Sequence, residues 1–160
     1  MANLNKSKNN KNTIIISLGD PAGIGAEIIL KALGSKRLNN NIQPLLVGCK
    51  NTIYKTCKKL ITHGINNIPD PKNLNIIDIP LEKKIIPGKV NKDSGSASFK
   101  WLLNATNLIL EGKGNALVTA PISKLAWHKA GHKFAGQTEL LGKLTNKKTS
   151  MLFTAISPNN

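Results

Sequence analysis

The fold is decided by the segment TIIISLGDPAGIG at residues 13–25. Its first half is a run of β-branched and other apolar residues, which is typical of a buried strand. Its second half, rich in glycine and proline, predicts a tight loop that leads into a helix. We expect this helix to end at Gly34 and to carry an apolar stripe made of Ile24, Ile28 and Ala32, widened by Ile29 and Leu33.

Strands and helices are expected to alternate along the rest of the chain. Further strands are predicted at residues 44–48, 76–79, 115–119 and 150–156. Helices are predicted between them, capped by Asn51, by Asp93 or Ser94, opened by Pro121, and covering 138–144. This alternation predicts an α/β fold with a doubly wound, mostly parallel sheet.

The chain is predicted to hold a polar tail and one unfinished domain. Residues 1–12 are rich in Lys and Asn and are expected to be disordered, whereas residues 13–160 form the α/β domain. Only four residues follow the strand predicted at 150–156. Because a parallel strand needs cover on both faces, the domain is predicted to be incomplete, as if truncated.

Composition excludes several classes of protein. No apolar run approaches the roughly 20 residues of a transmembrane helix, and the polar start is no secretory signal, so we expect no membrane contact. Two cysteines, Cys49 and Cys57, form no zinc or disulfide pattern, which favours the cytoplasm. The net charge of +15 comes almost wholly from scattered lysines, with Arg37 the only arginine, so a nucleic-acid binder is the last-ranked alternative.

Three loops carry candidate chemistry. The loop at 19–25 offers three glycines and Asp20, which could approach a ligand or merely cap the next helix. The loop at 119–124 ends in Lys124, which could meet a phosphate or be an ordinary surface lysine. In the third, Gln137 and Thr138 precede a helix that they could simply begin. The three histidines share no metal-ligand spacing.

These motifs together resemble one family. GDPAGIG at 19–25 with Glu27 closely resembles the opening of the 4-hydroxythreonine-4-phosphate dehydrogenase family of pyridoxal phosphate (vitamin B6) biosynthesis. The segments 87–89, 94–95, 116–124 and 130–139 follow in that family's order. The resemblance covers residues 13–156 and looks like the amino-terminal half of a family member.

The resemblance implies a fold similar to isocitrate and isopropylmalate dehydrogenases. It implies a homodimeric oxidoreductase that uses NAD or NADP and a divalent metal to oxidise and decarboxylate 4-phosphooxy-L-threonine. The family's substrate pair corresponds here to Gln137 and Thr138, with Gln137 where the family usually has histidine. The family's metal-binding histidines and most of its nucleotide contacts have no counterpart in this chain. It therefore implies no metal ligand here and an inactive chain when alone.

Two alternatives stay open. The chain could belong to a relative that acts on another phosphorylated hydroxy acid, a possibility raised by Gln137 in place of histidine. It could instead be a non-catalytic chain that binds a phosphorylated ligand or serves as a dimer partner. Lys124 and Asp20 are the loop residues that a phosphorylated ligand or its neighbours would meet in either case.

Overall fold

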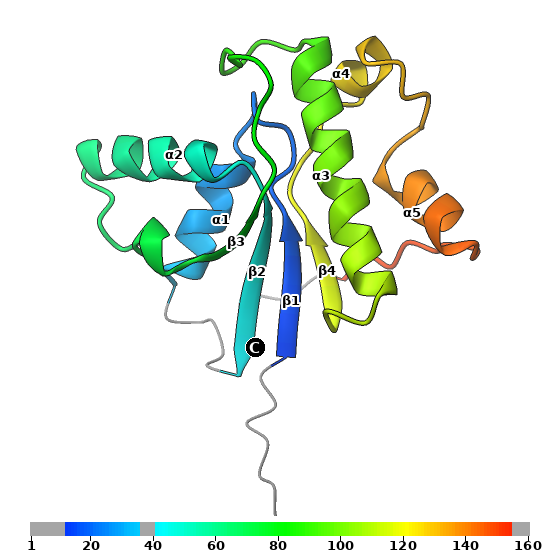
Figure 1. Cartoon of the computed structure of the whole chain (residues 1–160), viewed down its shortest axis with the longest axis horizontal. Coiled ribbons are helices and arrows are strands. Elements are labelled where there is room, and N and C mark those ends of the chain that lie inside the picture. The colour runs from blue at the N-terminus through cyan, green and yellow to red at the C-terminus, as the bar shows by residue number, and fades with distance from the viewer. Residues whose placement is uncertain (1–11, 36–40, 155–160) are drawn as a thin grey trace, which may run out of the picture.

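The structure is a computed structural model that describes residues 12–35 and 41–154. Its centre is a four-stranded sheet in the order β3-β2-β1-β4, in which all neighbouring pairs are parallel (Figure 1). The strands are β1 Asn12–Ser17, β2 Ile42–Gly48, β3 Asn75–Asp78 and β4 Ala116–Thr119. A parallel α/β sheet was the fold class that the sequence predicted, and it is confirmed.

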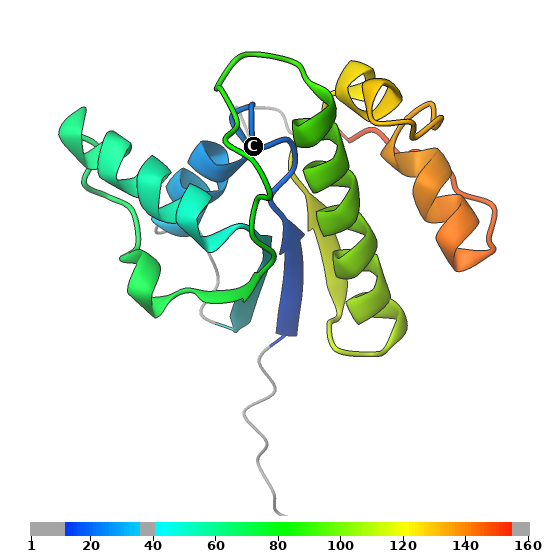
Figure 2. The same ribbon diagram turned by 45° about the horizontal axis from the view of Figure 1, so that its top comes forward.

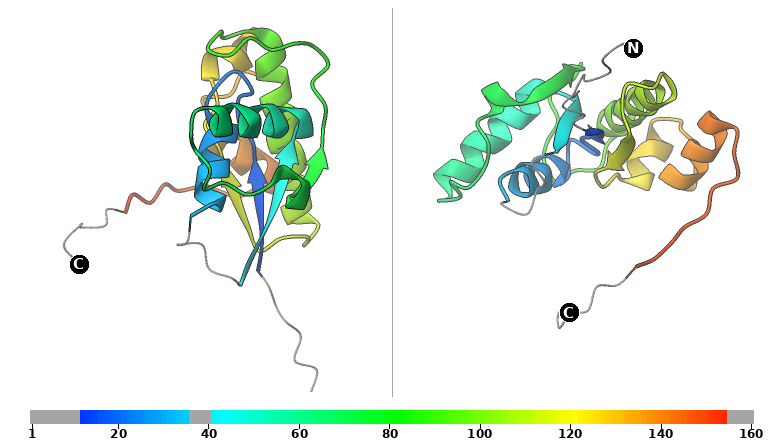
Figure 3. Two further views of the ribbon diagram at one scale, coloured as in Figure 1. Left: turned by 90° about the vertical axis from the view of Figure 1, so that its left-hand side faces the viewer. Right: turned by 90° about the horizontal axis from the view of Figure 1, so that it is seen from below.

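Five α-helices of the described residues surround this sheet. They are α1 Gly25–Leu33, α2 Lys50–Thr62, α3 Lys92–Leu110, α4 Lys124–Lys129 and α5 Gln137–Thr145. A short 3-10 turn, η1 Pro71–Asn73, precedes β3. Helices α1 and α2 lie on one side of the sheet and α3 on the other, while α4 and α5 lie beyond β4 (Figure 3).

Alternate residues of the central strands build two cores. Ile15 and Val47 are fully buried and pack with Ala105 of α3. Ile16 and Leu46, the next residue in one strand and the preceding residue in the other, belong instead to the core that includes α1 and α2. Because successive side chains of a strand point to opposite faces, a continuous apolar run is required wherever both faces are covered.

The predicted strand at 150–156 is wrong for the residues that the structure describes. Residues 150–154 form no strand, and Met151, Leu152 and Phe153 are 70%, 88% and 86% exposed. Residues 155 and 156 lie outside the described part, as do residues 1–11 of the tail predicted at 1–12. The tail prediction is wrong at Asn12, which already begins β1. The apolar run favours a strand, but a strand needs a partner, and this segment runs away from the sheet (Figure 3).

The apolar stripe expected on α1 is also partly wrong. Ile24 and Ile28 are 60% and 39% exposed, and the apolar residues that α1 buries are Ala26, Ile29 and Leu30. The helix carries more apolar surface than its neighbours cover. Sequence periodicity therefore predicted the helix and the buried Ile29 correctly, but it placed the centre of the buried stripe on Ile24, Ile28 and Ala32, which are exposed.

Three helix starts differ from the expected ones because other side chains satisfy the first amides. Asn91 caps α3 by accepting from Ser94 N at 2.9 Å, in place of Asp93 or Ser94. Helix α4 begins after Ser123 and not at Pro121, since the Ser123 Oγ caps it by accepting from Ala126 N at 3.2 Å. Helix α2 begins one residue before the predicted cap Asn51, with Lys50 N donating to Asp78 Oδ1 at 2.8 Å. Within 12–35 and 41–154, no helix is both long and apolar enough to cross a membrane.

Candidate functional site

The loops that follow β1 and β4 meet at the carboxyl edge of the sheet, which Figure 2 turns toward the viewer. The two strands are paired with Ser17 opposite Thr119. Ala120 N donates to Ser17 O at 3.0 Å, and Asp20 N donates to Pro121 O at 2.9 Å. In open parallel sheets, ligands bind at this edge. The first two sequence-predicted loops are therefore brought together where a site is expected.

Asp20 is a buried carboxylate that shapes its own loop. Only 6% of its surface is exposed, and its Oδ1 accepts from Ala22 N at 2.8 Å. The alternative that it caps α1 is wrong, because the N-cap position is Ile24 and no side chain bonds there. Asp20 also lines a cavity of about 730 Å³ between α1, α2 and the segment 80–87.

The glycines of this loop allow close packing of the chain on itself. Gly19 has a φ of +72°, and a Cβ there would lie 2.4 Å from Pro121 O. A Cβ on Gly25 would lie 2.1 Å from Leu18 O. These positions therefore exclude a side chain because protein backbone already fills the space. They do not form an open cradle for a nucleotide pyrophosphate.

Gln137 joins the third motif to the second loop. It is the first residue of α5, and its Nε2 donates to Ala120 O at 3.3 Å. Its Oε1 is buried and accepts no hydrogen bond from the described residues. Leaving a buried acceptor without a donor costs about 1–3 kcal/mol, so a ligand that offers an N–H or O–H here would be favoured.

Lys124 and Thr138 flank the start of α5. A Cβ on Gly136, the N-cap residue, would lie 3.4 Å from Lys124 Cε and 3.9 Å from its Nζ. Gly136 offers no side-chain cap, and the Thr138 side chain is exposed. The side chain of Glu139 in α5 reaches back to the preceding loop, where its Oε2 accepts a hydrogen bond from Ala135 N. An ammonium group beside an uncapped helix start is suited to an anionic ligand.

The described residues do not fit a divalent metal. Within 12–35 and 41–154, no three His, Cys, Asp or Glu side chains gather closely enough to hold one. His132 stacks on Phe99 with 3.7 Å between ring centroids, and His128 Nε2 lies 3.2 Å from Phe134 O. We therefore derive no chemical step through a metal bound by this chain.

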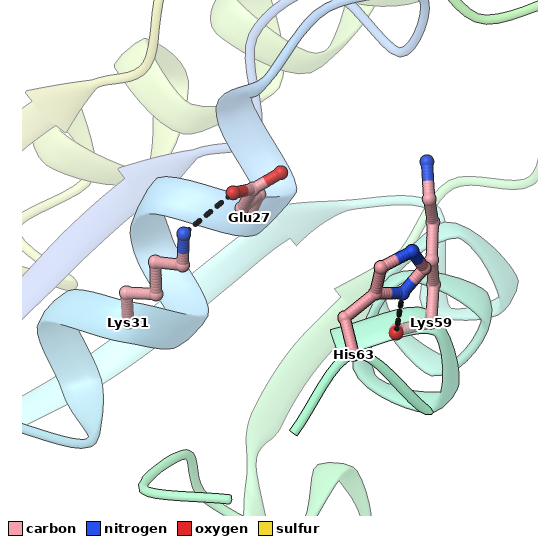
Figure 4. Close-up of polar contacts among 4 residues, drawn as sticks. All are labelled: Glu27, Lys31, Lys59 and His63. Carbon is pink, nitrogen blue, oxygen red and sulfur yellow. Dashed lines mark hydrogen bonds and ion pairs between the residues drawn. The ribbon is translucent and has the colours of Figure 1, made fainter. Parts of the chain in front are cut away.

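Charged residues of α1 and α2 border the cavity of Asp20. Glu27 accepts from Lys31 Nζ at 2.6 Å, and this hydrogen bond and charge lower the pKa of the Glu27 carboxyl (Figure 4). His63 turns its Nδ1 to Lys59 O at 2.8 Å. Lys55 and Lys59 line the cavity, a role that sequence reasoning missed. Their spacing of four residues on one helix was the available signal.

Comparisons with known proteins place the chain in a family. A family profile described as "Pyridoxal phosphate biosynthetic protein PdxA" matches residues 40–157. The chain belongs to this family. The resemblance that the three loops carry is thereby confirmed.

Named relatives of the family are similar over most of this chain. A 4-hydroxythreonine-4-phosphate dehydrogenase of Synechococcus sp. (strain RCC307) is 47% identical over 148 residues, which cover 92% of this chain and 44% of the relative. A D-threonate 4-phosphate dehydrogenase of Salmonella typhimurium is 39% identical, covering 85% of this chain and 45% of the relative. Both names describe oxidoreductases that act on phosphorylated four-carbon acids.

Solved structures agree with the fold. The crystal structure of a 4-hydroxythreonine-4-phosphate dehydrogenase from Burkholderia phymatum has a TM-score of 0.76 at 27% identity, covering 86% of this chain and 44% of that one. One from Klebsiella pneumoniae has a TM-score of 0.70 at 36% identity, covering 84% and 45%. The chain thus spans less than half the length of the relatives that it matches.

Proposed function

We propose that this chain provides one half of a cytoplasmic, homodimeric, NAD(P)-dependent dehydrogenase that oxidises and decarboxylates 4-phosphooxy-L-threonine in pyridoxal phosphate biosynthesis. The observation that carries the proposal is the start of α5. There Gln137 and Thr138, the residues that resemble the family's substrate pair, lie beside the ammonium group of Lys124. Family membership and the relatives' names support the reaction class.

Three residues of this half then have binding roles. Lys124 and the free amides at the start of α5 attract an anionic group of the substrate. The Thr138 hydroxyl adds a hydrogen bond to the same molecule. The Gln137 amide, held by Ala120 O, presents its Oε1 to a substrate donor. Gln137 orients but does not transfer protons, because an amide does not titrate.

The cofactor and metal chemistry needs residues other than these three. The glycine loop packs on its own backbone, and the described residues do not gather a metal site. We therefore assign NAD(P) and the divalent metal mainly to polypeptide that corresponds to the part of the relatives not covered here. On this proposal, the 160 residues alone form no NADH from 4-phosphooxy-L-threonine.

A second substrate is favoured by a specific observation. The relatives include D-threonate 4-phosphate dehydrogenases at 38% and 39% identity, whose named substrate carries a hydroxyl where 4-hydroxythreonine 4-phosphate carries an ammonium group. The neutral Oε1 of Gln137 accepts from either group. Gln137 would therefore tolerate both substrates, and we keep D-threonate 4-phosphate as the alternative.

The test uses an enzyme completed by fusing the chain to the uncovered part of the Synechococcus relative. NADH formation is followed with both substrates. Thr138→Ala should lower kcat/KM by about 10- to 150-fold, since a hydrogen bond to a charged group is worth about 1.5–3 kcal/mol. Thr145→Ala, at the far end of the same helix, is the matched control and should leave kcat/KM nearly unchanged.

Three results would count against the proposal. A loss below about threefold in Thr138→Ala, with the circular dichroism unchanged, would make Thr138 only the start of a helix. NADH formation by the unfused chain would show that the half assignment is wrong. A completed enzyme that prefers D-threonate 4-phosphate would establish the alternative substrate. Gln137→His tests the family's usual residue, and an unchanged or lower rate would show that this protein does not need the histidine.

A further inference from the structure

The first turn of α5 is closed by a side chain that the proposed function does not use. Glu139 lies in this turn, two residues after Gln137, and its Oε2 accepts a hydrogen bond from Ala135 N. The bond bridges the three residues between its ends, and two of these are Gln137 and Thr138. The carboxylate forms no ion pair within 12–35 and 41–154, so this hydrogen bond is its one contact with a polar group there.

The start of α5 has little else to order it. The first four amides of an α-helix have no partner inside the helix, so the turn frays unless a cap holds it. The N-cap residue Gly136 offers no side chain, and the bond from Leu140 N to Gly136 O is long at 3.4 Å. In a capping box, a glutamate at the third helical position accepts from the N-cap amide. Glu139 occupies that position but accepts from Ala135, one residue further back, so it fixes how the chain enters the helix.

The other contacts of this turn leave the Thr138 hydroxyl without support of its own. The Gln137 side chain donates to Ala120 O at 3.3 Å, and Thr138 O accepts from Thr149 Oγ1 at 3.4 Å. Both distances are at the long end for hydrogen bonds. The Thr138 hydroxyl itself has no hydrogen-bond partner among the described residues. Its direction is therefore set by the backbone of the turn, and Glu139 is the side chain that closes that turn.

We propose that Glu139 is a positioning residue for substrate binding, whose hydrogen bond to Ala135 N holds the first turn of α5 so that the Thr138 hydroxyl is in place before the substrate arrives. The inference rests on the proposed function, because it requires Thr138 to contact the substrate. Glu139 itself touches neither the substrate nor the reacting atoms. Without its bond, the substrate must order the turn as it binds, and that cost reduces affinity without slowing the chemical step.

The test measures KM and kcat separately in the completed enzyme, with the better of the two phosphorylated substrates. Glu139→Ala should raise KM about 3- to 30-fold, the size of a lost helix-cap contact, and leave kcat within about twofold. Glu139→Gln should restore KM to within about twofold of the parent, because its amide oxygen still accepts from Ala135 N. Asp70→Ala is the matched control. It removes a carboxylate that accepts from Lys72 N at 2.9 Å at the start of η1, and it should leave KM unchanged.

The glutamine variant separates a hydrogen bond from a charge. A raised KM in Glu139→Ala that Glu139→Gln restores, with kcat kept, supports the proposal. An equal rise in both variants overturns it, because the negative charge would then be what acts. A KM increase below about threefold in Glu139→Ala, or a loss in kcat alone, overturns it as well. Circular dichroism checks that each variant is folded. Glu139→Asp, whose shorter side chain does not reach Ala135 N, replaces Glu139→Ala if that variant unfolds.

The double variant Thr138→Ala with Glu139→Ala separates this inference from the proposed function. Its KM should stay close to that of Thr138→Ala alone, since Glu139 acts through Thr138. A KM that rises by the full product of the two single effects overturns the inference. If Thr138→Ala lowers kcat/KM but Glu139→Ala changes nothing, the inference alone fails. If Thr138→Ala itself leaves kcat/KM unchanged, the proposed function fails first, and this inference falls with it.

Discussion

The two faces of the sheet differ in how completely their apolar side chains are buried. On the α3 face, Ile15 and Ala105 are completely buried in one core with Val47. On the α1 face, Ile16 is covered while its neighbour Val118 is half exposed. Both faces are equally apolar in sequence, so the difference arises from what packs on them and not from the strands themselves.

This difference separates the buried apolar residues, which stabilise the described fold, from the apolar residues that remain exposed in it. Apolar burial stabilises by roughly 25 cal/mol for each Å² removed from water, so a half-exposed side chain contributes much less than a sealed one. The candidate site lies where the two kinds of region meet, since Ala120 directly follows the strand that carries Val118 and also accepts from Gln137. We expect substitutions on the two faces to have effects of very different size.

The largest effect is expected from Trp101→Ala, because this α3 side chain lies in the large core shared with α1 and α2. The indole is fully buried, and its Nε1 donates to Ile79 O at 3.0 Å, so the change leaves both a large cavity and an unpaired carbonyl. We expect a loss of about 3–5 kcal/mol in the free energy of unfolding, measured by urea denaturation. A loss below about 1 kcal/mol would show that this core is as loosely packed as the exposed region around Val118.

A smaller but still large effect is expected from Gly95→Ala, where α3 meets α4. A Cβ at this position would lie 2.0 Å from Ala126 O, so the two helices must separate. We expect a loss of about 1–3 kcal/mol, because overpacking against backbone cannot be relieved by a side-chain movement. Ser96→Ala, an exposed neighbour on the same helix, is the control and should change stability by less than about 0.5 kcal/mol. Equal effects of the two changes would contradict the close contact.

The sequence predicted the sheet well because its strands carry local signals. The runs at 14–18, 44–48 and 115–119 are apolar on both alternating sets of residues, and all became central or neighbouring strands. The run at 150–156 has the same composition, yet residues 150–154 form no strand. Composition sets what a segment can become, whereas a strand also needs a neighbour with free hydrogen-bonding groups.

The sequence predicted which residues belong to the candidate site, but it did not predict the contacts that they make. The sequence selected Asp20, Lys124, Gln137 and Thr138, and the structure brings their loops to the same edge. It could not show that the glycines pack on their own backbone, nor that Gln137 bonds to Ala120, because the partners are distant in sequence. Whether these residues bind substrate stays a prediction.

On the open face, Val118→Ser is expected to cost little in the chain alone. Its side chain is 49% exposed and contributes to no cluster of buried residues, so we expect a loss below about 0.5–1 kcal/mol by urea denaturation. A large loss in the chain alone would mean that Val118 is already covered, and the contrast between the faces would disappear.

The smallest expected effect is a pH dependence from His132, at the rim of the covered face. Its ring stacks on Phe99, and burial lowers the pKa of the His132 imidazole. The unfolded chain, in which this pKa returns to about 6.5, then binds a proton more readily than the folded chain. The contribution of His132 to stability is therefore complete above that pH and declines as the pH falls toward the lowered pKa.

Unfolding free energies at pH 7.5 and 5.5 should differ less in His132→Phe, which keeps an aromatic stack, than in the parent chain. His63→Gln leaves the stack in place and should keep the parent's slope; if it removed the slope while His132→Phe did not, the pH dependence would belong to α2 and not to the rim of the α3 face.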